Sequence, residues 1–148
     1  MHVHFAENEE GHVTAGSLSV VIDGRRMAVG PGGSTVIPRG AVHRWWNEGD
    51  QTLELHGYAR PVVDLDRYLQ AIFDVINAGP AGRPLLMYLA HVSWRHRRTQ
   101  GIAVIPRPVQ AVLFPLLIAV GTLLGRYRGD DWPGCPSRCP GSTLAPGS

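Results

Sequence analysis

Tight turns recur at short intervals through the first 61 residues, and they restrict this part of the chain to short strands. The strongest signal is Asp23-Gly24, because a two-residue hairpin turn of this type requires positive φ at both positions. Residues 30–33 and 47–50 mark two further turns. The segments between the turns predict the strands of a sandwich or barrel at 18–22, 25–29, 35–37, 42–46 and 52–58.

The pattern becomes helical after residue 61. Apolar residues then recur at intervals of three and four, with Asp64 placed to cap the first helix. We expect helices at about 65–76, 84–98 and 108–125, and we expect His91 and His96 on the second helix to be exposed. The sequence therefore predicts three parts, which are a β domain over 1–61, a helical extension over 62–128 and a disordered Gly/Pro-rich tail over 129–148.

Composition limits the classes of partner and the compartment. The formal net charge is +2 and the arginines are scattered, which argues against nucleic-acid binding. Cys135 and Cys139 lie in the tail and are interpreted as incidental thiols, because no further cysteine completes a zinc site. Met1 leads directly into polar and acidic residues, so no secretory signal is predicted and the cytoplasm is the expected location.

An uncharged apolar segment, residues 109–125, lies near the end of the chain. Its length is at the lower limit for a membrane span, and it contains Pro115 as well as Gln110 and Thr122. A buried helix that covers the β domain or joins two subunits explains the segment slightly better. A membrane span or an in-plane anchor is the alternative.

The residues that indicate chemistry lie in the β domain. His2 and His4 are two positions apart, so on a strand both side chains leave the same face. Glu9 follows after a short loop, and His43 lies on a later strand. Three imidazoles and one carboxylate suit Fe(II), Mn(II), Ni(II), Cu(II) or Zn(II). An octahedral ion would keep two positions for water or substrate, which is typical of reactive rather than structural sites.

Two spacing patterns resemble the motifs of the cupin family. The first runs His2-Val-His4, four residues, Glu9, six residues, Gly16. The second runs Gly32, five residues, Pro38-Arg-Gly40, two residues, His43, three residues, Asn47. Gly32 lies in a turn, and Pro38 and Gly40 bend the chain between two strands. The resemblance covers residues 1 to about 61.

The resemblance implies a mainly β cupin fold, that is a double-stranded β-helix or jelly-roll barrel, followed here by about three α-helices. In the family the first motif is normally preceded by a glycine and by further strands, whereas His2 is the second residue here. Either the barrel lacks its first strands or the natural start lies upstream. We also expect the chain to form a homodimer that completes the sheet edges.

The resemblance further implies that His2, His4, Glu9 and His43 hold one divalent transition metal, with Fe or Mn favoured over Ni, Cu or Zn. Glu7 and Glu10 are interpreted as solvated, because only Glu9 keeps the family's distance to Gly16. His12 and His56 match no motif position and are interpreted as structural. Trp45 shares the strand face of His43 and either walls the site or packs in the core.

Function follows from this site rather than from the fold, because one fold hosts many activities. The leading hypothesis is a small metal-dependent oxidoreductase of dioxygenase-like type, favoured over an isomerase, that acts on a small organic molecule. Glu9 would be a metal ligand and also a catalytic base. The competing hypothesis is a non-catalytic cupin that binds or senses a small ligand, with residues 109–125 as a membrane or dimer interface.

Overall fold

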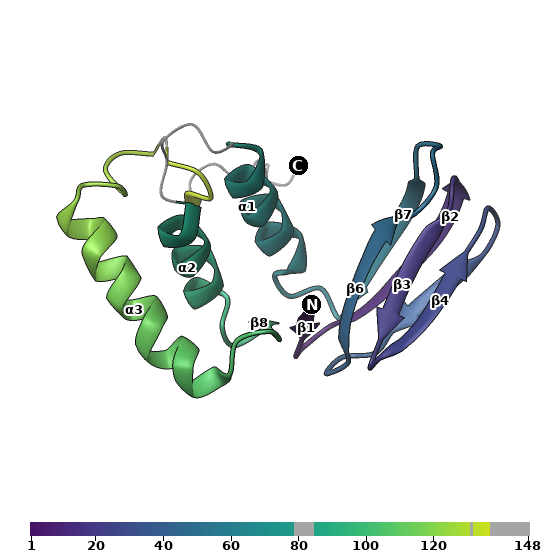
Figure 1. Ribbon diagram of the computed structural model, residues 1–148, viewed down its shortest axis with the longest axis horizontal. Coiled ribbons are helices and arrows are strands. Elements are labelled where there is room, and N and C mark those ends of the chain that lie inside the picture. Colours follow the sequence, from purple (N-terminus) through teal and green to yellow (C-terminus); the bar gives the residue numbers. More distant parts are fainter. Residues whose placement is uncertain (79–84, 131, 137–148) are drawn as a thin grey trace, which may run out of the picture. The chain divides into compact units, whose positions relative to one another are not determined.

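The computed structural model describes residues 1–78, 85–130 and 132–136 (Figure 1). Seven strands come first, and an eighth lies between the second and third of three helices. The strands are β1 (His2–His4), β2 (Asn8–Ala15), β3 (Leu18–Ile22), β4 (Arg25–Val29), β5 (Ser34–Ile37), β6 (Val42–Asn47), β7 (Glu54–Arg60) and β8 (Gln100–Ile102). The helices are α1 (Leu65–Asn77), α2 (Leu85–Arg95) and α3 (Arg107–Leu123).

The strands form two antiparallel sheets, with the orders β4-β3-β6-β1-β8 and β5-β2-β7. The hairpin between β3 and β4 forms at the predicted turn, where Asp23 has φ 47° and Gly24 has φ 82°. This geometry matches the right-handed twist of the flanking strands. The mainly β, jelly-roll class expected from the sequence is confirmed.

The barrel itself is not closed. No ladder of backbone pairing connects the five-stranded sheet to the three-stranded sheet in the part of the chain that the structure describes. β5 and β7 each pair only with β2 in that sheet, so they form its two edges. The expected barrel is therefore an open two-sheet arrangement.

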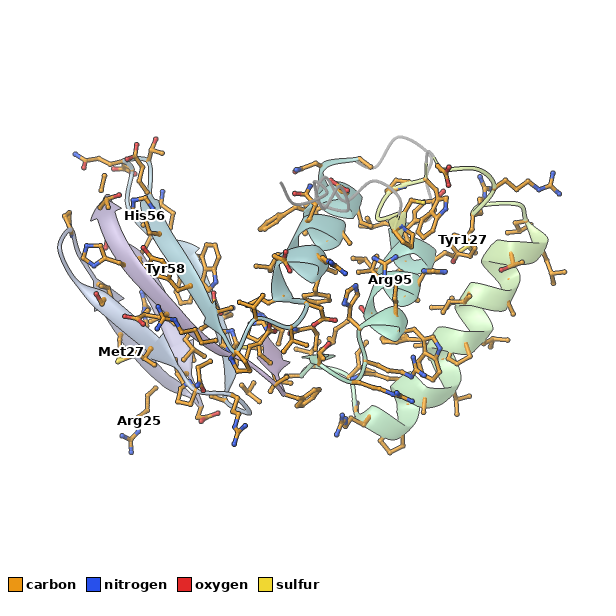
Figure 2. The ribbon with its side chains drawn as sticks, turned by 180° about the vertical axis from the view of Figure 1, so that it is seen from behind. Arg25, Met27, His56, Tyr58, Arg95 and Tyr127 are labelled. Atoms are coloured by element: carbon orange, nitrogen blue, oxygen red, sulfur yellow. The ribbon has the colours of Figure 1, made fainter. Side chains whose placement is uncertain are left out.

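The core of the β domain lies between the inward faces of the two sheets. Val13, Leu18, Val20 and Ile37 are buried there, and they alternate along their strands with residues that point outward. Figure 2 labels His56 on the outer face of β7, where it is exposed. Because side chains alternate between the two faces of a strand, only every second residue can point into the space between the sheets.

β8 was not predicted from the sequence. It interrupts the helical region and pairs antiparallel with β1, so that β1 lies between β6 and β8 rather than at a sheet edge. The described residues accordingly form two compact units. One contains residues 1–65 and 97–106, and the other contains residues 66–96 and the described residues from 107 onward.

The helical unit is held together by α2, α3 and the segment after α3. His96 is buried and His91 is half-buried against the rings of Tyr127 and Trp132, so the expectation that both histidines are exposed is wrong. The predicted helix start at Pro84, together with Cys139 and residues 137–148 of the predicted tail, falls outside the described residues.

α3 occupies most of the apolar segment 109–125. Among the helices that the structure describes, none combines the length and the apolar character needed to cross a membrane.

Candidate metal centre

β1 carries two of the four predicted ligands. His2 lies directly opposite His43 of β6 in the strand register, and Val3 pairs with Val42. On its other side, β1 pairs with β8 through His2, Val3 and His4. A strand with partners on both sides is held far more firmly than a free chain end. The structure thus gives the first two histidines a rigid position.

The second motif brings His43 to the same place. Gly40 has φ 85°, a left-handed conformation that suits glycine, and its N–H donates to the carbonyl of His4 at 2.7 Å. Beside it, the Asn8 side chain accepts a hydrogen bond from the backbone N–H of Arg39 at 2.9 Å. These two contacts attach the turn before β6 to His4 and to Asn8, which lie on either side of the loop between β1 and β2. Glu9 follows directly after Asn8 on β2.

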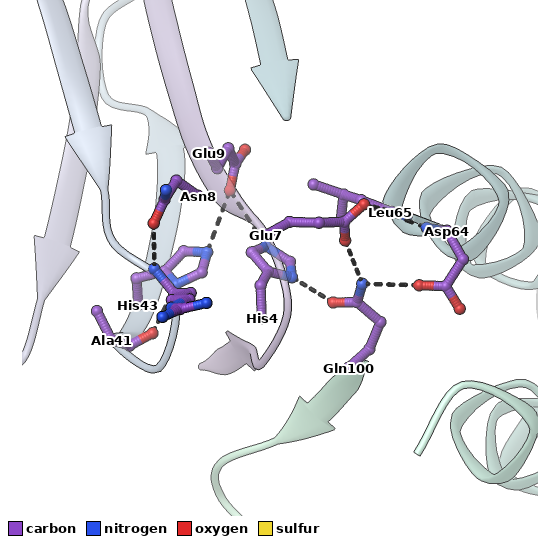
Figure 3. Close-up of polar contacts among 10 residues, drawn as sticks. His4, Glu7, Asn8, Glu9, Ala41, His43, Asp64, Leu65 and Gln100 are labelled. Atoms are coloured by element: carbon purple, nitrogen blue, oxygen red, sulfur yellow. Dashed lines mark hydrogen bonds and ion pairs between the residues drawn. The ribbon is translucent and has the colours of Figure 1, made fainter. Parts of the chain in front are cut away.

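The four predicted ligands converge. One ligand atom from each of His2, His4, Glu9 and His43 lies within 4.8 Å of the other three. Glu9 Oε2 is 3.2 Å from His4 Nε2 and 3.3 Å from His43 Nε2 (Figure 3). The histidine ring centroids are 4.2–4.9 Å apart. His4 and His43 are buried, whereas Glu9 is partly accessible.

The hydrogen bonds around the site determine which nitrogens can bind a metal. His43 Nδ1 donates to the carbonyl of Ala41 at 3.0 Å, because a carbonyl can only accept. His4 Nδ1 faces the amide oxygen of Gln100, which also can only accept. In the neutral rings, both Nε2 atoms therefore carry a lone pair directed at the Glu9 carboxylate.

This arrangement fits a cation. His43 Nε2 is buried without a hydrogen bond of normal geometry, although Glu9 Oε2 lies close to it. Two imidazole lone pairs and a carboxylate that face one point repel one another unless a proton or a metal ion lies between them. The donor set of nitrogen and oxygen suits divalent transition metals.

The charge states of the metal-free site follow the same geometry. Burial raises the pKa of Glu9, but its contacts with His4 and His43 outweigh burial and lower the pKa to about 2. Burial lowers the pKa of His4, yet the hydrogen bonds to Glu9 and Gln100 outweigh it and raise the pKa above its usual value. Burial, followed by the neighbouring His43 and His4, lowers the pKa of His2 to about 3. In the metal-free site the ionised carboxylate therefore favours a proton on His4.

Glu7 and Gln100, which form a buried hydrogen-bond network beside His4, were not predicted from the sequence. Glu7 was expected to be solvated, but it is 1% exposed, and this expectation is wrong. One of its carboxylate oxygens accepts hydrogen bonds from the backbone N–H groups of residues 63, 64 and 65, and the other accepts from the Gln100 amide at 2.9 Å. The only available signal was the acidic cluster itself, which does not distinguish a helix cap from a solvated loop.

The remaining candidates lie outside the cluster. Glu10 is exposed, and His56 lies opposite His12 on the outer face of β2 and β7. His12 hydrogen-bonds Ser34 there at 2.9 Å. Trp45 instead lines a small cavity of about 10 Å³ between the sheets, beside Glu9. Of the two roles expected for Trp45, the structure therefore supports a position in the wall of this cavity.

Comparison with known proteins identifies the β domain. Residues 1–58 match the family model described as "Cupin domain". Residues 1–58 form a cupin domain. The match ends before α1, so the helices and β8 are outside it.

No curated protein matches this chain. Among solved structures, part of this chain is similar to part of a protein from Acidithiobacillus ferrooxidans ATCC 23270, described as "Putative sugar phosphate isomerase". The two share 24% sequence identity, with a TM-score of 0.38. The similarity covers 41% of this chain and 40% of that chain. A likeness of this extent does not indicate a shared activity.

Proposed function

We propose that the cupin domain binds one divalent transition metal through His2, His4, Glu9 and His43. The observation that carries this proposal is the convergence of these four donors within 4.8 Å, with the lone pairs of His4 and His43 directed inward. Fe or Mn is favoured, and Ni, Cu and Zn also fit the donor set.

We further propose that the metal serves a reaction of a small organic molecule, in an oxidoreductase of dioxygenase-like type. The bound metal would supply Lewis acidity and redox capacity. The cavity beside Glu9 supports the proposal. It is walled mainly by apolar side chains, among them Leu18, Val20 and Leu55, which would exclude water. At about 10 Å³ it has room for about one water molecule, so a substrate would approach the metal from the accessible side of Glu9.

Thr35 is a polar residue in the wall of this cavity. It is 7% exposed, and its hydroxyl has no hydrogen-bond partner among the described residues. A buried hydroxyl without a partner is costly, and one water molecule in this cavity would satisfy it.

Glu9 is proposed both as a metal ligand and as a catalytic base. Its pKa of about 2 in the metal-free site keeps the carboxylate ionised, which suits a ligand. The same low pKa makes it a weak base at neutral pH, because an effective base has a pKa near the working pH. Glu9 would act on protons only after it leaves the histidines. In a non-catalytic cupin, the alternative function, it would remain a ligand.

Metal analysis tests the first proposal. Protein incubated with each metal and then desalted is expected to retain about one equivalent. His43→Ala is expected to lose this binding, because it removes a buried ligand. His56→Ala is the matched control, since His56 is an exposed histidine on the neighbouring sheet, and it should retain the metal. Folded wild-type protein without stoichiometric metal would refute the proposal.

Glu9→Gln tests the enzymatic proposal once oxygen uptake or product formation has been found by substrate screening. At matched metal occupancy, loss of a positioned base should reduce turnover by ~10²–10⁴-fold. Glu10→Gln, an exposed carboxylate on the same strand, is the control. Undiminished turnover would remove Glu9 from the chemistry. Bound ligands without any product would favour the binding function.

A further inference from the structure

Gln100 lies outside the cupin match, yet it contacts a proposed metal ligand. It stands directly opposite His4 in the register of β8 and β1, and it is 2% exposed. Its amide oxygen faces His4 Nδ1, and its amide nitrogen donates to Glu7 at 2.9 Å and to Asp64 at 3.2 Å (Figure 3). Both ends of one amide group are therefore engaged in a buried network.

The two carboxylates determine how this amide is oriented. Glu7 and Asp64 present oxygens that accept hydrogen bonds, so the NH₂ end must face them and the oxygen must face His4. The reversed amide would place its oxygen against two carboxylates. It would also present a donor to His4 Nδ1, which would move the ring proton to Nε2.

Glu7 is itself held in place. Its other oxygen accepts from the backbone N–H groups of residues 63, 64 and 65, at 2.9, 3.1 and 3.2 Å. Thr99 donates to the second oxygen of Asp64 at 2.8 Å. The amide of Gln100 is thus anchored by the chain segment that enters α1.

We propose that Gln100 is a positioning residue for the metal centre, whose amide oxygen holds the Nδ1–H of His4 and so leaves Nε2 free to bind the metal. This inference rests on the proposed metal-binding function. Hydrogen bonds of this kind behind a histidine ligand fix its tautomer and ring orientation, and their loss typically weakens metal binding ~10–100-fold. The segment beyond the cupin match would then contribute directly to the site.

Two substitutions separate this role from simple packing. Gln100→Met keeps the length of the side chain but offers His4 no acceptor. It is expected to weaken zinc binding ~10–100-fold. Gln100→Glu keeps an acceptor for His4 while losing the donor to Glu7 and Asp64. It should retain the Nδ1–H tautomer even if it binds zinc less tightly. Thr99→Val is the control, because it removes a contact to Asp64 without touching His4.

The tautomer of His4 is the decisive measurement. Long-range ¹H–¹⁵N spectra of zinc-loaded wild-type protein should show His4 with a slowly exchanging proton on Nδ1. That protection should disappear in Gln100→Met and persist in Gln100→Glu and Thr99→Val. Equal zinc affinity and an unchanged His4 signal in Gln100→Met would overturn the inference.

The failure of the metal proposal would look different. Wild-type protein would then bind no zinc, and the His4 tautomer would be read in metal-free protein at a pH where the ring is neutral. A proton on Nδ1 there would support the role of Gln100 in orienting the ring. A proton on Nε2 of wild-type His4 would refute it, even if Gln100→Met proved unable to fold.

Discussion

Glu7→Ala is expected to destabilise the protein strongly, although Glu7 is outside the proposed ligand set. The carboxylate is buried, and it accepts four hydrogen bonds, three from backbone N–H groups and one from Gln100. The N–H groups at the start of a helix have no partners within the helix. Glu7 accepts from the two residues before α1 and from its first residue, so it anchors the chain where it enters the helix.

The magnitude follows from the groups left without partners. A side chain that accepts from backbone N–H groups at a helix start stabilises a protein by about 0.5–2 kcal/mol, the value known for helix caps. A buried amide deprived of an acceptor costs about 1–3 kcal/mol more, and water that enters the space left by the side chain recovers part of this. We expect a decrease in the free energy of unfolding of about 2–4 kcal/mol for Glu7→Ala. Glu7→Gln should cost less, because one oxygen can still accept from the backbone, although its NH₂ group would face that of Gln100.

Urea unfolding of chelator-treated protein measures this difference, followed by tryptophan fluorescence and by far-ultraviolet circular dichroism. Removal of metal keeps ligand binding from contributing to stability. Glu10→Ala is the matched control, because Glu10 is an exposed carboxylate three residues away, and surface changes usually stay within about 0.5 kcal/mol. If Glu7→Ala and Glu10→Ala unfold at the same urea concentration with equal slopes, Glu7 does not anchor the start of α1.

Two further predictions concern acidity and assembly. In metal-free protein the pKa of His2 is lowered from 6.5 to about 3 by burial and then by His43 and His4, so unfolding takes up a proton and stability should fall as the pH decreases from 6.5 to 3. The depressed pKa of Glu9 adds a loss as the pH falls from 4.5 to about 2, whereas His4, with a raised pKa, contributes stability below 6.5 that is lost as the pH rises. His2→Ala should flatten the acid side of the stability curve, and an unchanged curve would contradict the assignment. We also propose that the chain forms a homodimer through α3, where Val112 and Leu116 are 71% and 59% exposed. Light scattering should give twice the chain mass for wild type and a monomer for Val112→Asp with Leu116→Asp, and a wild-type monomer at every concentration would refute the proposal.

The β domain could be predicted because its signals are local. The Asp23-Gly24 turn and the two strands beside it lie within a dozen residues, and both strands form at the predicted positions. The convergence of His2, His4, Glu9 and His43 was also expected from the sequence, because these residues occupy fixed positions in the two motifs. Family resemblance supplied the pairing of the two motifs, which the residues alone left open.

The contacts of Glu7 and Gln100 around His4 could not be predicted from local sequence patterns. β8 has three residues, too few to show a period, and its partner β1 lies at the other end of the sequence. Glu7 looked like one of several surface acids, and Gln100 looked like an ordinary polar residue after a helix. Local composition determined the strands, the turns and the ligand types, because these depend on neighbouring residues. Only the tertiary structure decided that Glu7 is buried and that Gln100 reaches His4, because those contacts depend on the long-range pairing of β8 with β1.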